Sequence, residues 1–186
     1  MGFHTFNADQ AERLEDGAAR YRYLSREELL GALDIASTDT VADIGSGTGF
    51  YTDDVAPHAG SVYGVDVQEA MHDYYREKGV PSNVELVTAE ASELPFPDDE
   101  LDALFSTMTF HEFAEDEAVA ELARVLSPGS TVVIADWTAT GTGEAGPPLD
   151  ERYSGLDAEK LISNYGFEIT SLVERPETFL LTAQTF

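Results

Sequence analysis

Cysteine is absent from this chain of 186 residues. The absence excludes disulfide bonds, thiolate metal sites and cysteine nucleophiles. The sequence also has no run of 18 apolar residues, so we expect no transmembrane helix. Residues 1–6 lack the basic flank and the long apolar core of a signal peptide, and we therefore expect a cytoplasmic protein.

Positive charge is scarce. Lysine and arginine together number 10 against 36 aspartates and glutamates, which gives a formal net charge of -26. The acids are spread along the whole chain, which resembles the composition of proteins from halophilic microbes. An acidic face for a basic partner is the alternative. With either explanation, direct binding to a nucleic-acid backbone is disfavoured.

Short apolar runs alternate with helical stretches from residue 40 onward, and this alternation predicts an α/β fold with a doubly wound parallel sheet. The runs do not alternate strictly between apolar and polar residues, as expected for strands covered on both faces. The predicted strands are 40–44, 61–66, 84–88, 101–106 and 131–136, and the predicted helices are 50–57, 68–78 and 115–126. A helix at 157–164 and an antiparallel pair of strands at 168–173 and 179–185 should follow.

The first 36 residues read as helical. Asn7 is placed to cap a helix over residues 8–20, and Ser25 with Glu28 forms a capping-box pattern before a second helix. The length suits one domain, which we place at residues 1–186.

A glycine-rich loop from Asp43 to Gly49 closes the first predicted strand. Its spacing does not match the dinucleotide pattern G-x-G-x-x-G, because Phe50 or Thr52 stands where the last glycine is needed. At the end of the second strand, Asp66 can accept hydrogen bonds from both hydroxyls of a ribose. The loop therefore suits a nucleoside without phosphates better than a nicotinamide cofactor.

Four segments in order resemble the motifs of class I S-adenosylmethionine-dependent methyltransferases, and of their small ubiquinone-biosynthesis-like members in particular. They are residues 41–49, 89–98, 121–129 and 165–167. The resemblance implies a single Rossmann-like sheet, mostly parallel, with the strand order 3-2-1-4-5-7-6 and the last strand antiparallel. It also implies an N-terminal helical lid (residues 1–36) over an S-adenosylmethionine-binding core (residues 40–186).

The resemblance also assigns roles to single residues. Asp43 and the backbone at Gly45 and Gly47 would hold the methionine end of the cofactor, and Asp66 would bind the ribose. Val67 would pack on the adenine, and Glu90 would accept from the adenine amino group. The implied cofactor-binding residues are Asp43, Gly45, Ser46, Gly47, Gly49, Asp66, Val67, Glu90, Ala91, Ser106 and Thr107. Glu90 departs from the family pattern, which usually has aspartate at this position.

The implied reaction is the in-line transfer of a methyl group to a small-molecule acceptor, for which the protein mainly supplies orientation. His111 follows the fourth strand and is a candidate general base, although it could equally line the pocket without reacting. Aromatic faces can hold a sulfonium cation. The candidates by position are Phe50, Tyr51, Phe110 and Trp137, with core packing the better reading of Phe50.

Other features narrow the chemistry. The segment Ser106–Thr109 does not match the motif of adenine amino methyltransferases, and Asp136–Trp137 does not match the ligands of metal-dependent catechol-type enzymes. We therefore expect no catalytic metal. We expect Arg152 to pair with one of the many acids rather than with an anionic acceptor. His4, His58 and His72 read as surface residues.

Three rival functions remain open. The first is a nucleic-acid or protein methyltransferase, which the acidic charge disfavours for nucleic acid. The second is a degenerate member that binds S-adenosylmethionine or S-adenosylhomocysteine without turnover. The third is a dehydrogenase, which the glycine spacing disfavours. The acceptor and the oligomeric state are not predicted.

Overall fold

The computed structural model describes residues 7–186, and its strands form one seven-stranded sheet in the order β3-β2-β1-β4-β5-β7-β6. The strands are β1 (Thr40–Ile44), β2 (Ser61–Asp66), β3 (Val84–Thr88), β4 (Leu101–Thr107), β5 (Leu126–Trp137), β6 (Phe167–Glu174) and β7 (Thr178–Thr185). The α-helices are α1 (Gly17–Tyr23), α2 (Arg26–Leu33), α3 (Phe50–Val55), α4 (Glu69–Lys78), α5 (Phe110–Phe113), α6 (Asp116–Val125) and α7 (Gly155–Ser163). Three 3-10 helices complete the list: η1 (Ala8–Glu15), η2 (Ala56–His58) and η3 (Leu149–Glu151).

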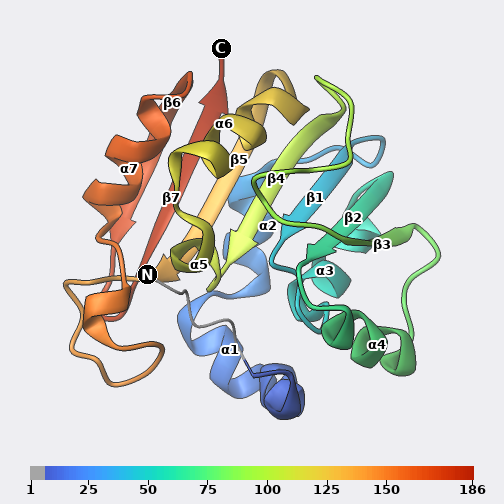
Figure 1. Cartoon of the computed structure of the whole chain (residues 1–186), viewed down its shortest axis with the longest axis horizontal. Helices are drawn as coiled ribbons and strands as arrows, with labels where there is room; N and C mark the ends of the chain where they lie inside the picture. The colour runs from blue at the N-terminus through green and yellow to red at the C-terminus, as the bar shows by residue number, and fades with distance from the viewer. Residues whose placement is uncertain (1–6) are drawn as a thin grey trace.

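The strand directions match the prediction. Strands β1 to β5 pair in parallel, whereas β7 runs antiparallel to both β5 and β6. In Figure 1, β4 and β5 point toward α1 and β7 runs the opposite way. The order of the strands reverses between β1 and β4, so the carboxyl ends of these two strands mark the place where such sheets bind ligands.

Both faces of the sheet are buried, which explains why the strands read as apolar runs. Successive residues of a strand point to opposite faces. On β4, Leu104 faces α5, α6 and α7, whereas Ala103 and Phe105 face α2 and α3. The same alternation divides β5, where Ile134 belongs to the first core and Val133 to the second.

The predicted helix over residues 8–20 is wrong as a single element. The 3-10 helix η1 follows Asn7 and runs from Ala8 to Glu15, and a separate helix α1 then begins at Gly17. The Asp16 side chain causes the break, because it accepts hydrogen bonds from Ala18 N and Ala19 N and so caps a new helix.

The capping box before α2 is confirmed. Ser25 Oγ accepts from Glu28 N at 3.2 Å, and Ser25 N donates to Glu28 Oε2 at 2.9 Å. Leu29 and Leu33 of this helix are buried against the sheet. Of the segment predicted as a lid, α2 therefore belongs to the core, and η1 and α1 are the parts that border the cavity described below.

Two further expectations are corrected. Strand β5 starts at Leu126, earlier than predicted, because Leu126 pairs with Leu101 before an irregularity in the β4–β5 register. His72 is fully buried rather than on the surface, and its Nδ1 lies 3.1 Å from Thr88 Oγ1. Burial lowers the pKa of His72. His58 is exposed as expected, whereas His4 lies outside the described residues.

No helix in residues 7–186 is long and apolar enough to cross a membrane.

Candidate cofactor and acceptor site

A cavity of about 590 Å³ opens at the carboxyl ends of β1, β2, β4 and β5, and η1 and α1 form part of its lining. Its volume falls within the roughly 300–1,000 Å³ that is typical of small-molecule sites. The predicted site residues that line it are Gly45, Ser46, Gly47, Asp66, Val67, Ala91, Thr107 and His111. Four predicted residues lie outside its lining, namely Asp43, Gly49, Glu90 and Ser106.

The glycine loop after β1 has a left-handed backbone at each glycine, with φ of +79° at Gly45, +53° at Gly47 and +78° at Gly49. A Cβ at Gly45 would lie 2.3 Å from Thr109 Cγ2, and one at Gly49 would lie 2.1 Å from the Tyr75 ring. These two glycines therefore allow close packing behind the loop. Gly47 is different, since a Cβ there would meet no atom closer than 3.6 Å, and its backbone faces the cavity.

Asp66 is held in place by the loop. Its Oδ2 accepts from Gly47 N at 2.8 Å, and its Oδ1 accepts from Gln68 N at 2.9 Å. The side chain still borders the cavity, with 9% of the residue exposed. Each carboxylate oxygen has a second acceptor position. The carboxylate can therefore take two more hydrogen bonds from a diol such as that of a ribose.

Asp43 lies behind the loop, 1% exposed, and its Oδ2 accepts from Thr52 Oγ1 at 2.7 Å. Its Oδ1 has no hydrogen-bond partner in the described part of the chain. Burial raises the pKa of Asp43 to about 7, an effect that the Thr52 hydrogen bond and the charge of Arg20 only partly offset. Ser106 is likewise buried, and its Oγ has no hydrogen-bond partner among residues 7–186, whereas Glu90 is exposed.

Arg20 of α1, which the sequence places in the N-terminal helices over the pocket, lines the cavity although it is not among the predicted cofactor-binding residues. Its guanidinium carbon lies 4.9 Å from the centre of the Tyr51 ring and 5.4 Å from that of Phe50. Its Nε is buried without a hydrogen-bond partner among residues 7–186. Burial lowers the pKa of Arg20, although arginine stays charged at any physiological pH. The arrangement provides a positive charge for an anionic group beside the glycine loop.

His111 of α5 and Asp136 near the end of β5 form a hydrogen-bonded pair. Nδ1 of His111 lies 3.0 Å from both carboxylate oxygens, and His111 N donates to Asp136 Oδ2 at 2.6 Å. A carboxylate only accepts, so the Nδ1 proton points at Asp136 and Nε2 is left for another partner. Burial lowers the pKa of His111, but the Asp136 hydrogen bond and nearby acids outweigh burial and leave it above 6.5.

The sequence predicts His111 as a candidate base, with the adjacent Glu112 as the residue that could orient it, and does not indicate Asp136 as the partner. The two residues are 25 positions apart: His111 follows β4, and Asp136 lies near the end of the neighbouring parallel strand β5. The carboxyl ends of parallel neighbours meet at one edge of the sheet, and this rule could have suggested the pair.

The aromatic residues predicted to hold the sulfonium fall into two groups. Phe50, Tyr51 and Trp137 line the cavity, whereas Phe110 is fully buried away from it. The Tyr51 hydroxyl donates to Leu24 O at 2.8 Å and so ties α3 to the end of α1.

The N-terminal helices are attached to the glycine loop by polar contacts. Thr48 Oγ1 donates to Glu15 Oε1, and Lys78 Nζ lies 3.2 Å from Glu15 and 2.8 Å from Asp53. With a net charge of -26, the chain has few lysines and arginines for such ion pairs. The Lys78 ion pair with Glu15 and the Thr48–Glu15 hydrogen bond hold η1 beside the glycine loop.

The methyltransferase-domain family matches residues 42–134, half of the chain. The chain belongs to this family. An S-adenosylmethionine-dependent methyltransferase from Aquifex aeolicus has a similar solved structure, with 30% identity and a TM-score of 0.88, covering 98% of this chain and 100% of the other. S-adenosylmethionine is the cofactor that the family and this likeness imply.

The curated relatives that this chain matches are longer proteins. The ubiquinone/menaquinone biosynthesis C-methyltransferase UbiE of Pseudomonas entomophila is 32% identical over 113 residues, which cover 56% of this chain and 44% of the relative. The biotin biosynthesis bifunctional protein BioHC of Cellvibrio japonicus is 36% identical over 94 residues, which cover 50% of this chain and 18% of the relative. The chain thus spans less than half the length of both.

The residues that line the cavity fit S-adenosylmethionine. Gly47 leaves its side of the cavity open, and the Asp66 carboxylate can receive the ribose hydroxyls. Val67 is 47% exposed, so it offers an apolar surface to the adenine. Arg20 can face the carboxylate of the methionine end.

Proposed function

We propose that this protein transfers a methyl group from S-adenosylmethionine to a small-molecule acceptor, with His111 as the general base. The proposal depends on one observation. A single cavity joins the Asp66 loop to the His111–Asp136 pair, so cofactor and acceptor sites are continuous.

The comparisons and the charge support a small acceptor. The relatives described above are named for ubiquinone, menaquinone and biotin biosynthesis. A net charge of -26 opposes contact with a phosphate backbone, which disfavours a nucleic-acid substrate.

Each proposed role follows from the position of the side chain. S-adenosylmethionine supplies, when bound, a methyl group on a positively charged sulfur. Asp66 orients the ribose and Arg20 the carboxylate. His111 Nε2 takes the proton of an acceptor hydroxyl or amine, while Asp136 holds the opposite side of the ring and stabilises the resulting imidazolium.

Calorimetric titration tests the cofactor half of the proposal. S-adenosylmethionine is titrated into the wild type, Asp66→Ala and Glu168→Ala in molar KCl. Glu168 is an exposed acid on β6 and controls for the loss of one negative charge. We expect the wild type and Glu168→Ala to bind with micromolar affinity and Asp66→Ala to lose binding. A folded wild type that binds no cofactor would overturn the proposal.

A screen of small hydroxyl and amine compounds tests the catalytic half, with release of S-adenosylhomocysteine as the readout. We expect His111→Ala to lower turnover strongly while cofactor affinity stays unchanged, because His111 acts on the acceptor proton. A protein that binds the cofactor and methylates no acceptor would instead support the non-catalytic alternative.

A further inference from the structure

The segment between Trp137 and Arg152 forms one wall of the cavity. Ala145, Gly146 and Pro147 line the cavity together with Trp137, and Tyr23 of α1 meets them there. We call Tyr23, Trp137 and residues 145–147 the loop wall. The wall adjoins the histidine, because Asp136, which holds His111, directly precedes Trp137 and accepts a hydrogen bond from Trp137 N at 2.8 Å.

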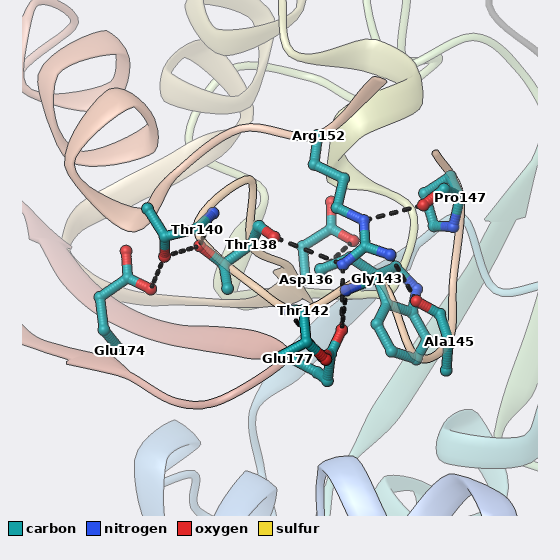
Figure 2. A network of polar contacts seen from close by, with 11 residues as sticks. Asp136, Thr138, Thr140, Thr142, Gly143, Ala145, Pro147, Arg152, Glu174 and Glu177 are labelled. Carbon is teal, nitrogen blue, oxygen red and sulfur yellow. Dashed lines mark hydrogen bonds and ion pairs between the residues drawn. The ribbon is translucent and has the colours of Figure 1, made fainter. Parts of the chain in front are cut away.

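A buried arginine holds this wall together. The Arg152 side chain is 1% exposed and does not line the cavity. Figure 2 shows its guanidinium surrounded by carbonyl oxygens: Nε donates to Pro147 O at 2.8 Å, one terminal nitrogen donates to Thr138 O at 3.4 Å, and the other donates to Ala145 O. Arg152 thus connects both ends of the loop.

Glu177, the residue before β7, completes the network from the opposite side. One of its oxygens lies 3.3 Å from the Arg152 guanidinium, and the carboxylate also accepts from Thr142 N at 2.8 Å and from Gly143 N at 3.2 Å (Figure 2). The pair is buried, so both charges depend on these bonds. Removing the arginine should free the loop and leave Glu177 without its positive partner.

The wall fixes the orientation of Trp137. A Cβ at Gly146 would lie 2.4 Å from the indole, so only glycine fits against this ring. The Tyr23 ring centre lies 4.7 Å from that of Trp137 at an angle of 64°, and the Arg152 guanidinium carbon lies 5.6 Å from the indole centre. The indole is therefore held by three neighbours before any acceptor arrives.

Among residues 7–186, the two arginines next to the wall are both paired with acids: Arg152 with Glu177, and Arg22, which lies over the Tyr23 ring, with Glu144. The donors of Arg152 are directed at backbone oxygens and Glu177, and the arginine lies behind the lining. Arg13 and Arg20 do line the cavity, but they belong to η1 and α1 on the side of the glycine loop, where Leu14 packs near Gly47 and Arg20 lies against the rings of α3. The charges around His111 are negative, since Asp136, Glu112 and Glu151 all raise its pKa. An anionic acceptor would meet repulsion here, whereas a flat uncharged group would meet aromatic rings.

We propose that the loop wall is the acceptor subsite, that it takes a flat uncharged group, and that Arg152 is its positioning residue. The proposal rests on the proposed function for the identity of the acceptor side, but its test needs no turnover.

Trp137 gives a direct readout, because it is the single tryptophan of the chain. The probes are 4-nitrobenzamide and 4-nitrobenzoate, two flat quenchers of the same shape that differ in charge. Each is titrated in molar KCl with S-adenosylhomocysteine present, so that the net charge of the protein is screened. We expect the amide to quench Trp137 saturably and the carboxylate to bind about tenfold more weakly or worse.

The possible results of these titrations distinguish a failure of the acceptor subsite from a failure of the proposed function. Equal or tighter binding of 4-nitrobenzoate would overturn the preference for an uncharged group. Binding of S-adenosylhomocysteine without saturable quenching by either probe would overturn the subsite while leaving the cofactor site intact. A failure to bind S-adenosylhomocysteine is a failure of the proposed function.

Variants test the role of Arg152. We expect Arg152→Met to weaken 4-nitrobenzamide binding by about tenfold while the affinity for S-adenosylhomocysteine stays within about twofold, and Arg152→Lys to recover part of the loss. Arg76→Met on α4 is the control, since Arg76 is an exposed arginine in ion pairs away from the wall. A folded Arg152→Met variant that binds 4-nitrobenzamide like the wild type would refute the positioning role.

A second variant tests the wall without breaking the buried pair. Gly146→Ala places a methyl group against the indole, so the emission maximum of Trp137 should shift and 4-nitrobenzamide binding should fall. Unchanged emission and unchanged probe binding in this variant would contradict the proposed wall even if Arg152→Met does not fold.

Discussion

Replacing Asp43 by asparagine should stabilise the folded protein at neutral pH and leave its stability unchanged in acid. The carboxyl group is 1% exposed, and one of its oxygens has no hydrogen-bond partner among residues 7–186. Burial raises its pKa from 3.8 to about 7. Asparagine has nearly the same shape, can still accept from Thr52, and carries no charge to bury.

The sign and size follow from proton linkage. The unfolded chain loses this proton near pH 3.8, whereas the folded protein keeps it until about pH 7. The free energy of unfolding therefore falls as the pH rises through this window, and the loss is complete above it. One pKa unit corresponds to about 1.4 kcal/mol, so the ionised carboxylate costs on the order of 4 kcal/mol.

Urea unfolding at molar KCl between pH 4 and pH 8, followed by circular dichroism, measures the difference. At pH 8 we expect the midpoint of Asp43→Asn to lie well above that of the wild type, and at pH 4 we expect the two to coincide. Glu168→Gln removes the same charge from an exposed site and should behave like the wild type. A difference that is absent at pH 8, or that does not shrink toward pH 4, would refute this account of the buried carboxyl group.

Three other predictions concern the loop, the histidine and the charge. Gly45→Ala should lower the free energy of unfolding by about 2–5 kcal/mol, because the methyl group meets Thr109. Gly129 has an equally left-handed backbone but lies in open space, so Gly129→Ala should lower the free energy of unfolding by only about 1–2 kcal/mol. In an NMR titration, His111 should lose its proton above pH 6.5, and Asp136→Asn should move this midpoint lower; equal midpoints would show that Asp136 does not control the ring. Raising KCl from 0.1 to 1 M shortens the screening length from about 10 Å to about 3 Å, so the melting temperature should rise, and a flat response would argue against self-repulsion.

Local sequence determined much of the sheet. The bounds of β1, β2 and β3 match the predicted runs, because strands covered on both faces are short apolar segments between turn residues. The glycine loop can also be predicted from the sequence, because the left-handed backbone at Gly45, Gly47 and Gly49 favours glycine at these fixed positions. The first helix was mispredicted because Asp16 caps a new helix where apolar spacing alone shows no break.

Only the tertiary structure decided which side chains meet. The pairs His111–Asp136 and Arg152–Glu177 each join residues 25 positions apart, and their contacts depend on how β5, β7 and the loop before α7 come together. Burial is likewise a property of the whole fold. A sequence shows that Asp43 lies near the end of a strand, but the raised pKa of its carboxyl group comes from the side chains that exclude water around it. Sequence patterns thus place the cofactor loop, while the acceptor side of the cavity is set by contacts between distant segments.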